Sequence, residues 1–137
     1  ELRDLGWTIR DPTELSSSLS NYQDYLQSSK AEFSIAKEGY VASRSGWLSE
    51  RTGNYLACGR PALVQDTGFS DWLECGEGML AFSTIDEAIA GIEEINARYH
   101  HHCAAAREVA EAFFDSKKVL GELIEDAYRL SRPSPHH

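Results

Sequence analysis

The chain has 137 residues, 42% of them hydrophobic, which is enough for one domain with a substantial core and short for two. Its 13 Lys and Arg residues stand against 22 Asp and Glu residues, so the formal net charge is -9. This charge disfavours a nucleic acid as the main partner, because binding a phosphate backbone requires an excess of cations, and it disfavours adsorption to an anionic membrane.

The cysteines and the hydropathy of the chain favour a cytoplasmic protein. Cys58, Cys75 and Cys103 are widely spaced and form no CxxC pair, which indicates neither a disulfide framework nor a zinc ribbon. No apolar run reaches the roughly 18 to 20 residues of a spanning helix, and the first residues show no signal-peptide pattern. We expect residues 131–137 to be a disordered tail whose last two histidines resemble a purification-tag remnant.

The first third of the chain predicts a strand, a helix and a second strand. Residues 5–10 have the short apolar character of a strand, which Pro12 would end because proline cannot donate to a ladder. Tyrosine and leucine then recur at helical spacing over about 20–29. Residues 31–36 alternate as in a strand, and a long loop over 37–47 follows.

The middle of the chain continues the alternation of helices and strands. Helical spacing returns over 48–58, where Ser45 or Ser49 can cap the start and Gly59 can supply a left-handed stop. After this helix we expect a buried strand at 60–65, one short helical turn at 70–73 and a second buried strand at 79–82.

The last third predicts three helices. Thr84 and Glu87 form a capping box, and the helix that they open carries one apolar face: Ile85, Ala88, Ile89, Ile92 and Ile95. A second helix is expected over 99–114. Asp115 or Ser116 then caps a final helix with its apolar residues inward: Val119, Leu120, Leu123, Ile124 and Ala127.

This order of elements predicts the fold class. A β-α-β-α-β sequence with short connections implies an α/β, Rossmann-like, three-layer domain with a mostly parallel sheet, here ending in helices. Ligands of such sheets bind in a crevice at the carboxyl ends of the strands. The loops that border this crevice are 36–48, 66–72 and 83–84.

Two of these loops carry candidate binding residues. The first precedes a helix amino terminus, where free amides favour a phosphate, and its candidates for a diphosphate cradle are Lys37, Arg44, Ser45, Gly46, Trp47, Ser49 and Arg51. The alternative is that these are solvated charges and a simple turn. The second loop could bind sugar hydroxyls through Gln65, Asp66, Thr67 and Gly68. Its alternative is a tight turn in which Asp66 caps a short helix and Gly68 takes a positive φ.

A run of histidines at 100–102 followed by Cys103 does not predict a metal site, because consecutive helical residues point about 100° apart. We expect a solvated histidine cluster there, and no metal or other cofactor. Cys58 and Cys103 are expected to be small core residues. No side chain pairs with an evident base, so the catalytic residues are not assigned.

Residues 54–64, with the sequence NYLACGRPALV, resemble the "E-A-x-A-C-G-x-P-V-V" stretch of group 1 glycosyltransferases. The likeness extends over about residues 5 to 127 and includes the loops at 65–68 and 76–78. It implies the carboxy-terminal, donor-binding domain of a GT-B enzyme, spanning 1–130, whose first β-α unit and amino-terminal, acceptor-binding domain are missing.

The resemblance also implies how a donor would bind. A helix such as 48–58 presents its amino terminus to the diphosphate of a nucleotide sugar, and a carboxylate on it grips the ribose. That position is Asn54 here, and the partner carboxylate eight residues earlier is Gly46, so the paired-glutamate motif is absent. Asn54 could still bond ribose hydroxyls. The implied partners are a nucleotide-sugar donor, an acceptor and the other domain, with a homo-oligomer as a further option. The alternative function is a non-catalytic nucleotide-sugar-binding or protein-interaction module of the same fold.

Overall fold

The computed structural model describes residues 1–131 and shows an α/β domain built on a three-stranded parallel sheet. The strands are β1 (Glu32–Ser34), β2 (Ala62–Gln65) and β3 (Met79–Phe82), and they lie in the order β1-β2-β3. Residues Phe33, Leu63 and Leu80 lie at the same level of the sheet. The predicted fold class is therefore confirmed. The tail expected at 131–137 lies, from residue 132 onward, outside the described residues.

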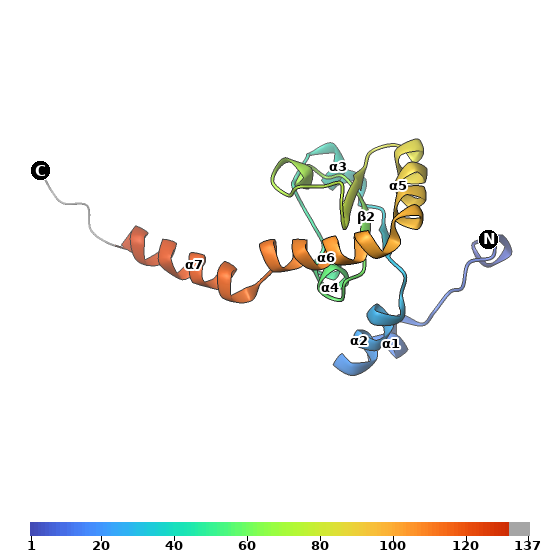
Figure 1. Ribbon diagram of the computed structural model, residues 1–137, viewed down its shortest axis with the longest axis horizontal. Coiled ribbons are helices and arrows are strands. Elements are labelled where there is room, and N and C mark those ends of the chain that lie inside the picture. Colours follow the sequence, from blue (N-terminus) through green and yellow to red (C-terminus); the bar gives the residue numbers. More distant parts are fainter. Residues whose placement is uncertain (132–137) are drawn as a thin grey trace, which may run out of the picture.

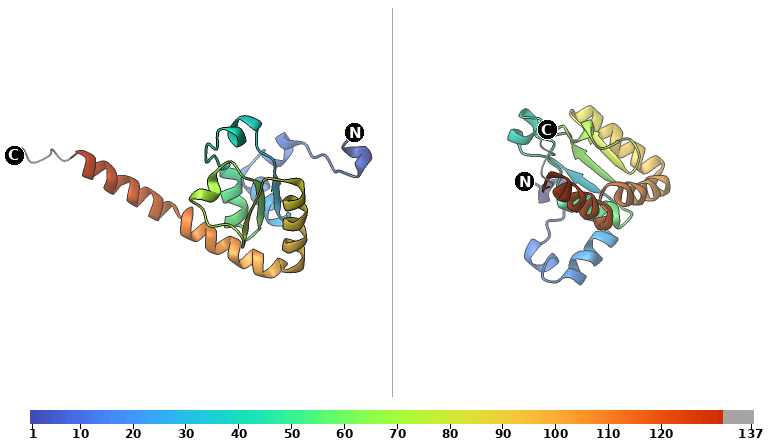
Figure 2. Two further views of the ribbon diagram at one scale, coloured as in Figure 1. Left: turned by 90° about the horizontal axis from the view of Figure 1, so that it is seen from above. Right: turned by 90° about the vertical axis from the view of Figure 1, so that its left-hand side faces the viewer.

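Helices cover both faces of the sheet (Figure 2). Helices α4 (Glu50–Ala57) and α6 (Tyr99–Phe113) pack on one face, and α5 (Ile85–Ala97) packs on the other. The core of the α4 and α6 side joins Leu56, Val64, Met79 and Ala106, among others. The core of the α5 side contains Leu63, Leu80, Phe82, Ala88 and Ile95. Alternate residues of β2 and β3 enter opposite cores, which is the geometry of a three-layer domain.

The predicted helix boundaries rest on caps that the structure contains. Ser49 accepts a hydrogen bond from the backbone N–H of Arg51 and caps α4, and Gly59 follows that helix with φ of 66°. Thr84 and Glu87 make the predicted capping box of α5. The backbone N–H of Lys117 donates to Asp115 Oδ1 at 2.8 Å, so Asp115 caps α7 (Ser116–Ser131).

The prediction of a strand over 5–10 is wrong. A 3₁₀ helix, η1 (Arg3–Leu5), ends at Gly6 with φ of 86°, and the residues after it are exposed and pair with no strand. The chain next forms the short helix α1 (Pro12–Leu15), in which Pro12 occupies the first turn, where its missing N–H costs nothing. Helix α2 (Leu19–Ser28) follows close to its expected position.

The long loop expected over 37–47 contains a helix of its own. Lys37 precedes α3 (Glu38–Ala42), five residues long, and the irregular segment that remains runs from 43 to 49. The predicted turn near 70–73 appears slightly earlier as the 3₁₀ helix η2 (Phe69–Asp71). Neither element has a hydrophobic repeat long enough to be recognised from periodicity.

Two apolar helix faces are less covered than the sequence suggests. On α5, Ala88 and Ile95 are buried, whereas Ile85, Ile89 and Ile92 are exposed. The prediction that the apolar residues of α7 point inward is wrong, because this helix buries no residue. Figure 1 shows α7 extending away from the rest of the domain. Within residues 1–131, no helix is both long and apolar enough to cross a bilayer.

Candidate functional site

The structure places a small cavity at the carboxyl ends of β1 and β2, where the fold predicts a ligand crevice. The cavity has a volume of about 40 Å³ and lies between the exits of these strands and the start of α4. Five of the residues predicted to bind a ligand line it: Trp47, Ser49, Arg51, Gln65 and Thr67. The two candidate loops, far apart in sequence, therefore meet.

Hydrogen bonds join the two loops directly. The backbone N–H of Gly46 donates to Thr67 O at 2.8 Å, and Thr67 Oγ1 donates to Trp47 O at 2.5 Å. Thr67 is fully enclosed, so its hydroxyl serves this contact rather than a ligand. Gly68 passes so close to Arg44 that a Cβ added to it would lie 3.0 Å from Arg44 O. The crevice floor is therefore a fixed backbone arrangement.

Asp66 is used within its own loop. Its Oδ1 accepts from the backbone N–H of Gly68 at 2.9 Å, and its Oδ2 accepts from Ser70 Oγ at 2.8 Å. Burial alone would raise the pKa of Asp66, but the hydrogen bonds from Ser70 and Gly68, with Arg44 nearby, lower it below 3.8. Gly68 has φ of 97°. The loop thus has the geometry of the capped tight turn that the sequence offered as its alternative.

Arg44 is fixed at the rim by carboxylates on the neighbouring loop. Its Nη2 lies 2.9 Å from both oxygens of Asp71, and its Nη1 lies 3.9 Å from Asp66 Oδ2. The hydrogen bond to Asp71 is the main cause that raises the pKa of Arg44 above its ordinary value. Arg44 is also the one non-glycine residue among 1–131 with a positive φ, 45°. An exposed guanidinium is therefore oriented at this edge by a strained backbone and two acidic partners.

Arg51 points to the sheet instead of standing free at the helix start. Its Nε donates to Glu32 Oε1 at 2.9 Å, and its Nη2 donates to Ser34 Oγ at 2.9 Å. Glu32 is only 4% exposed, and its bond with Arg51 is the main cause that raises the pKa of the arginine. Ser34 and Arg51 line one side of the cavity, and Glu32 lies behind them. The sequence did not single out Glu32 or Ser34. The signal available was a carboxylate and a hydroxyl at alternate positions of one short strand.

Aromatic side chains flank the rim of the crevice. Trp47 stacks on Tyr40 of α3 with ring centroids 4.8 Å apart and an interplanar angle of 13°. Trp72 lies so close to Gly46 that a Cβ added to this glycine would be 3.4 Å from Trp72 Nε1. Ser45 Oγ accepts from the backbone N–H of Trp47. Trp47 remains 40% exposed, so its ring is partly open to a planar or apolar ligand.

Two further polar groups face the interior of the cavity region. Gln65 Oε1 accepts from the backbone N–H of Ala36 at 3.1 Å, which ties the exit of β1 to the exit of β2. Thr52 is fully buried, and its hydroxyl has no hydrogen-bond partner among the described residues. Thr52 was not predicted, because a threonine on the buried face of a helix is indistinguishable in sequence from a core residue.

Lys37 and Asn54 do not line the cavity. Lys37 is exposed at the residue before α3, and Asn54 is exposed on α4, one turn after the start of the helix. The helix turns Thr52, Tyr55 and Leu56 inward, which leaves Asn54 on its outer side. Five other predicted residues belong to the two joined loops but also lie outside the cavity lining: Arg44, Ser45, Gly46, Asp66 and Gly68.

The histidine run is partly structural. His100 and His101 are exposed as expected, but the expectation of solvation is wrong for His102, which is 0% exposed. Its Nδ1 accepts from the backbone N–H of Gly78 at 3.1 Å. Among residues 1–131, no group of three or more His, Cys, Asp or Glu side chains is arranged to bind a metal ion. Cys58, Cys75 and Cys103 are partly buried and free.

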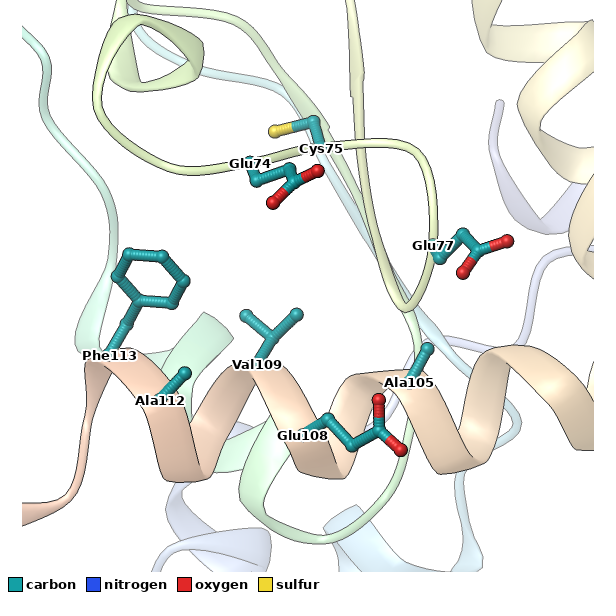
Figure 3. Close-up of a pocket in the computed structure, with 8 residues that line it drawn as sticks. All are labelled: Glu74, Cys75, Glu77, Ala105, Glu108, Val109, Ala112 and Phe113. Atoms are coloured by element: carbon teal, nitrogen blue, oxygen red, sulfur yellow. The ribbon is translucent and has the colours of Figure 1, made fainter.

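A separate cavity of about 340 Å³ lies between the loop at 74–77 and α6 (Figure 3). Its wall includes three carboxylates, Glu74, Glu77 and Glu108, and no lysine or arginine. Burial, with a smaller contribution from the charge of Asp66, raises the pKa of Cys75 to about 11. An acidic wall with a protonated thiol does not suit an anionic ligand, so this cavity is not the candidate site.

Comparison with known protein families agrees with the fold class. A family model described as glycosyl transferase-like matches residues 7–123, which is most of the chain. The chain therefore belongs to the glycosyl transferase-like family. No curated protein and no solved structure matches it. The resemblance to glycosyltransferases seen in the sequence is thus confirmed at the level of the family.

Proposed function

We propose that this domain binds the diphosphate of a nucleotide-sugar donor at the crevice and serves glycosyl transfer as the donor-binding half of a GT-B, group 1 enzyme. The observation that carries the proposal is the junction of the two loops. The contacts of Gly46 and Trp47 with Thr67 fix the segment before α4 at the carboxyl edge of the sheet. The amino end of α4 adjoins this segment, and helix amino termini attract anions.

Arg44 is the cation best placed to meet a diphosphate. It is exposed, and its closest partner, Asp71, is also exposed. A pair of exposed charges contributes little net stability in water, so a phosphate can replace Asp71 at small cost. Asp66 stays bonded to its own loop and keeps the guanidinium at the rim. Arg51 supports the site from behind, because its donors already bond to Glu32 and Ser34.

The proposed chemistry is electrostatic. As the bond between the anomeric carbon and the diphosphate breaks, negative charge grows on the leaving nucleoside diphosphate, and a fixed cation with helix amides stabilises it. Such stabilisation is strongest when water is excluded. We therefore propose that a second domain of the parent protein closes over the crevice and supplies acceptor contacts.

The alternative is a non-catalytic module that binds a nucleotide sugar or a protein through the same crevice. The observation in its favour is the absence of a carboxylate at two positions. Gly46 takes φ of 70° beside Trp72, and Asn54 carries no charge, so neither position offers the carboxylate seen in the related glycosyltransferase pattern. If Asn54 contacts ribose, Asn54→Ala should reduce the preference for a ribonucleotide over its deoxy form.

Isothermal calorimetry at low salt tests the proposal. The protein is titrated with UDP, GDP, dTDP and ADP, and we expect one of them to bind selectively. Arg44→Ala should then weaken its affinity about tenfold, which corresponds to about 1.4 kcal/mol. The matched control is Arg129→Ala on α7, an arginine that is exposed and paired with Asp126. The proposal that the crevice binds a diphosphate is refuted if the two variants have equal effects, or if no diphosphate binds.

A further inference from the structure

A wide groove adjoins the crevice on the side of the sheet edge, and its chemistry differs from that of the crevice. It has a volume of about 740 Å³ and lies between the segment at 7–16, helix α2, strand β1 and helix α4. Ser34 and Arg51 line both the groove and the small cavity of the crevice, so these two side chains form the wall between them. We call it the β1 groove.

The β1 groove has a polar centre that is already organised. Glu32 Oε1 accepts from Ser34 Oγ at 2.6 Å and from Arg51 Nε at 2.9 Å. These bonds fix the carboxylate without the help of a ligand. Its other oxygen, Oε2, is buried and has no hydrogen-bond partner among residues 1–131. An unsatisfied buried acceptor is destabilising, so a hydroxyl donor that reached this position would relieve that cost.

The walls of the groove are aromatic. Trp7, Tyr22, Tyr25 and Tyr55 contribute rings from three separate elements of the chain. Burial raises the pKa of Tyr55 to about 12, which keeps its phenol protonated and able to donate a hydrogen bond. A surface that alternates aromatic faces with hydroxyl and carboxylate groups suits a ligand with apolar C–H faces and a rim of hydroxyls.

The charges that line the groove select against a strongly charged ligand. Glu32 and Arg51 neutralise each other at close range, and Arg10 contributes one further positive charge at the outer wall. A diphosphate would have to compete with Glu32 for Arg51 and would lie beside an unpaired carboxylate oxygen. A neutral polyhydroxylated ligand meets no such repulsion.

We propose that the β1 groove binds an uncharged pyranose unit, stacked between Trp7 and the tyrosines, with one hydroxyl donating to Glu32. Its role as part of the glycosyl acceptor rests on the proposed function, since the wall formed by Ser34 and Arg51 would then separate acceptor from donor. The binding itself depends only on the groove. The site lies on this domain and adds to any contacts that a second domain makes.

The test is a chemical-shift titration of the ¹⁵N-labelled 137-residue protein with the methyl glycosides of glucose, galactose and mannose. We expect at least one glycoside to shift amides of residues 7–10, 22–25 and 31–34. Trp7→Ala and Tyr25→Ala should each weaken that binding about tenfold. The matched control is Tyr128→Ala, which removes an exposed tyrosine of α7 outside the groove and should change nothing.

Glu32→Gln tests the carboxylate, and its folding is checked by circular dichroism because the residue is buried. We expect weaker glycoside binding with the fold retained. If Glu32→Gln does not fold, Trp7→Ala decides, since Trp7 is exposed and lies outside both core clusters. The proposal is overturned if no glycoside shifts the groove amides, if shifts occur but neither aromatic variant alters them, or if amides 8–10 show hydrogen-exchange protection typical of a strand paired with β1.

A parallel titration with the nucleoside diphosphates separates this proposal from the proposed function. Binding of a diphosphate without binding of any glycoside would overturn the pyranose site alone. Binding of a glycoside without any diphosphate would support the groove and count against donor binding at the crevice. Glycoside shifts centred on residues 44–49 and 65–68, instead of the groove, would also refute the site.

Discussion

Replacing Gly68 by alanine should perturb the backbone beside the crevice, and the structure allows the resulting loss of folding stability to be calculated. Gly68 has φ of 97°, a conformation that costs an ordinary residue about 1–2 kcal/mol. An added Cβ would lie 3.0 Å from Arg44 O and 3.3 Å from Arg44 Cβ, which is tight enough to move the Arg44 backbone. Overpacking of this kind costs about 1–3 kcal/mol, and a shift of a few tenths of an ångström favours its lower end. We expect the free energy of unfolding to fall by about 2–3 kcal/mol.

Urea denaturation followed by circular dichroism measures this loss, and Gly76→Ala is the control. Gly76 has φ of 132° and no atom within 4 Å of an added Cβ, so Gly76→Ala should lower stability only through backbone strain, by about 1–3 kcal/mol. Gly68→Ala should also weaken binding of a nucleoside diphosphate because it moves Arg44, whereas Gly76→Ala should not. Equal losses of stability for the two variants would refute the packing argument.

The remaining predictions concern pH and one buried histidine. Asp66 has a lowered pKa in the folded protein, so the stability that it contributes is present above the ordinary value of 3.8 and is lost as the pH falls through and below it; Asp66→Asn should flatten the acid limb of stability against pH. Burial raises the pKa of Tyr55 from 10.0 to about 12, so stability should fall as pH rises across this interval, and Tyr55→Phe should abolish that loss in an alkaline denaturation series. His102→Ala leaves the N–H of Gly78 without its acceptor and should cost at least about 1–3 kcal/mol in urea, whereas the exposed His100→Ala should cost little.

Features that depend on neighbouring residues could be predicted from the sequence. The capping box of Thr84 and Glu87, the cap at Ser49 and the left-handed Gly59 each depend on groups within a few residues. These local interactions form whatever the rest of the fold is, so the sequence alone can predict them. The alternation at 31–36 predicts β1, and apolar runs next to proline or glycine predict β2 and β3.

Features that depend on distant partners could not be predicted. Residues 5–10 have the composition of a strand but pair with no neighbour, and pairing is what makes a strand. The same limit applies to the site. Arg51 was read as a phosphate ligand from its position near a helix start, whereas its nearest charge is Glu32, on a separate strand. The partner of Arg44, Asp71, likewise lies on another loop. Such pairs become visible only when topology brings the elements together.

The absence of any buried residue in α7 has a consequence for the dynamics of the chain. A 16-residue helix without tertiary packing depends on its own propensity, and isolated helices of about this length are marginal in water. Gly121 in its middle lowers that propensity further. Amides of α7 should therefore exchange with solvent through local opening, on a far shorter timescale than those of α6, which packs on the sheet. Once α7 opens locally, a protease should be able to cut within it and leave the sheet and its crevice folded.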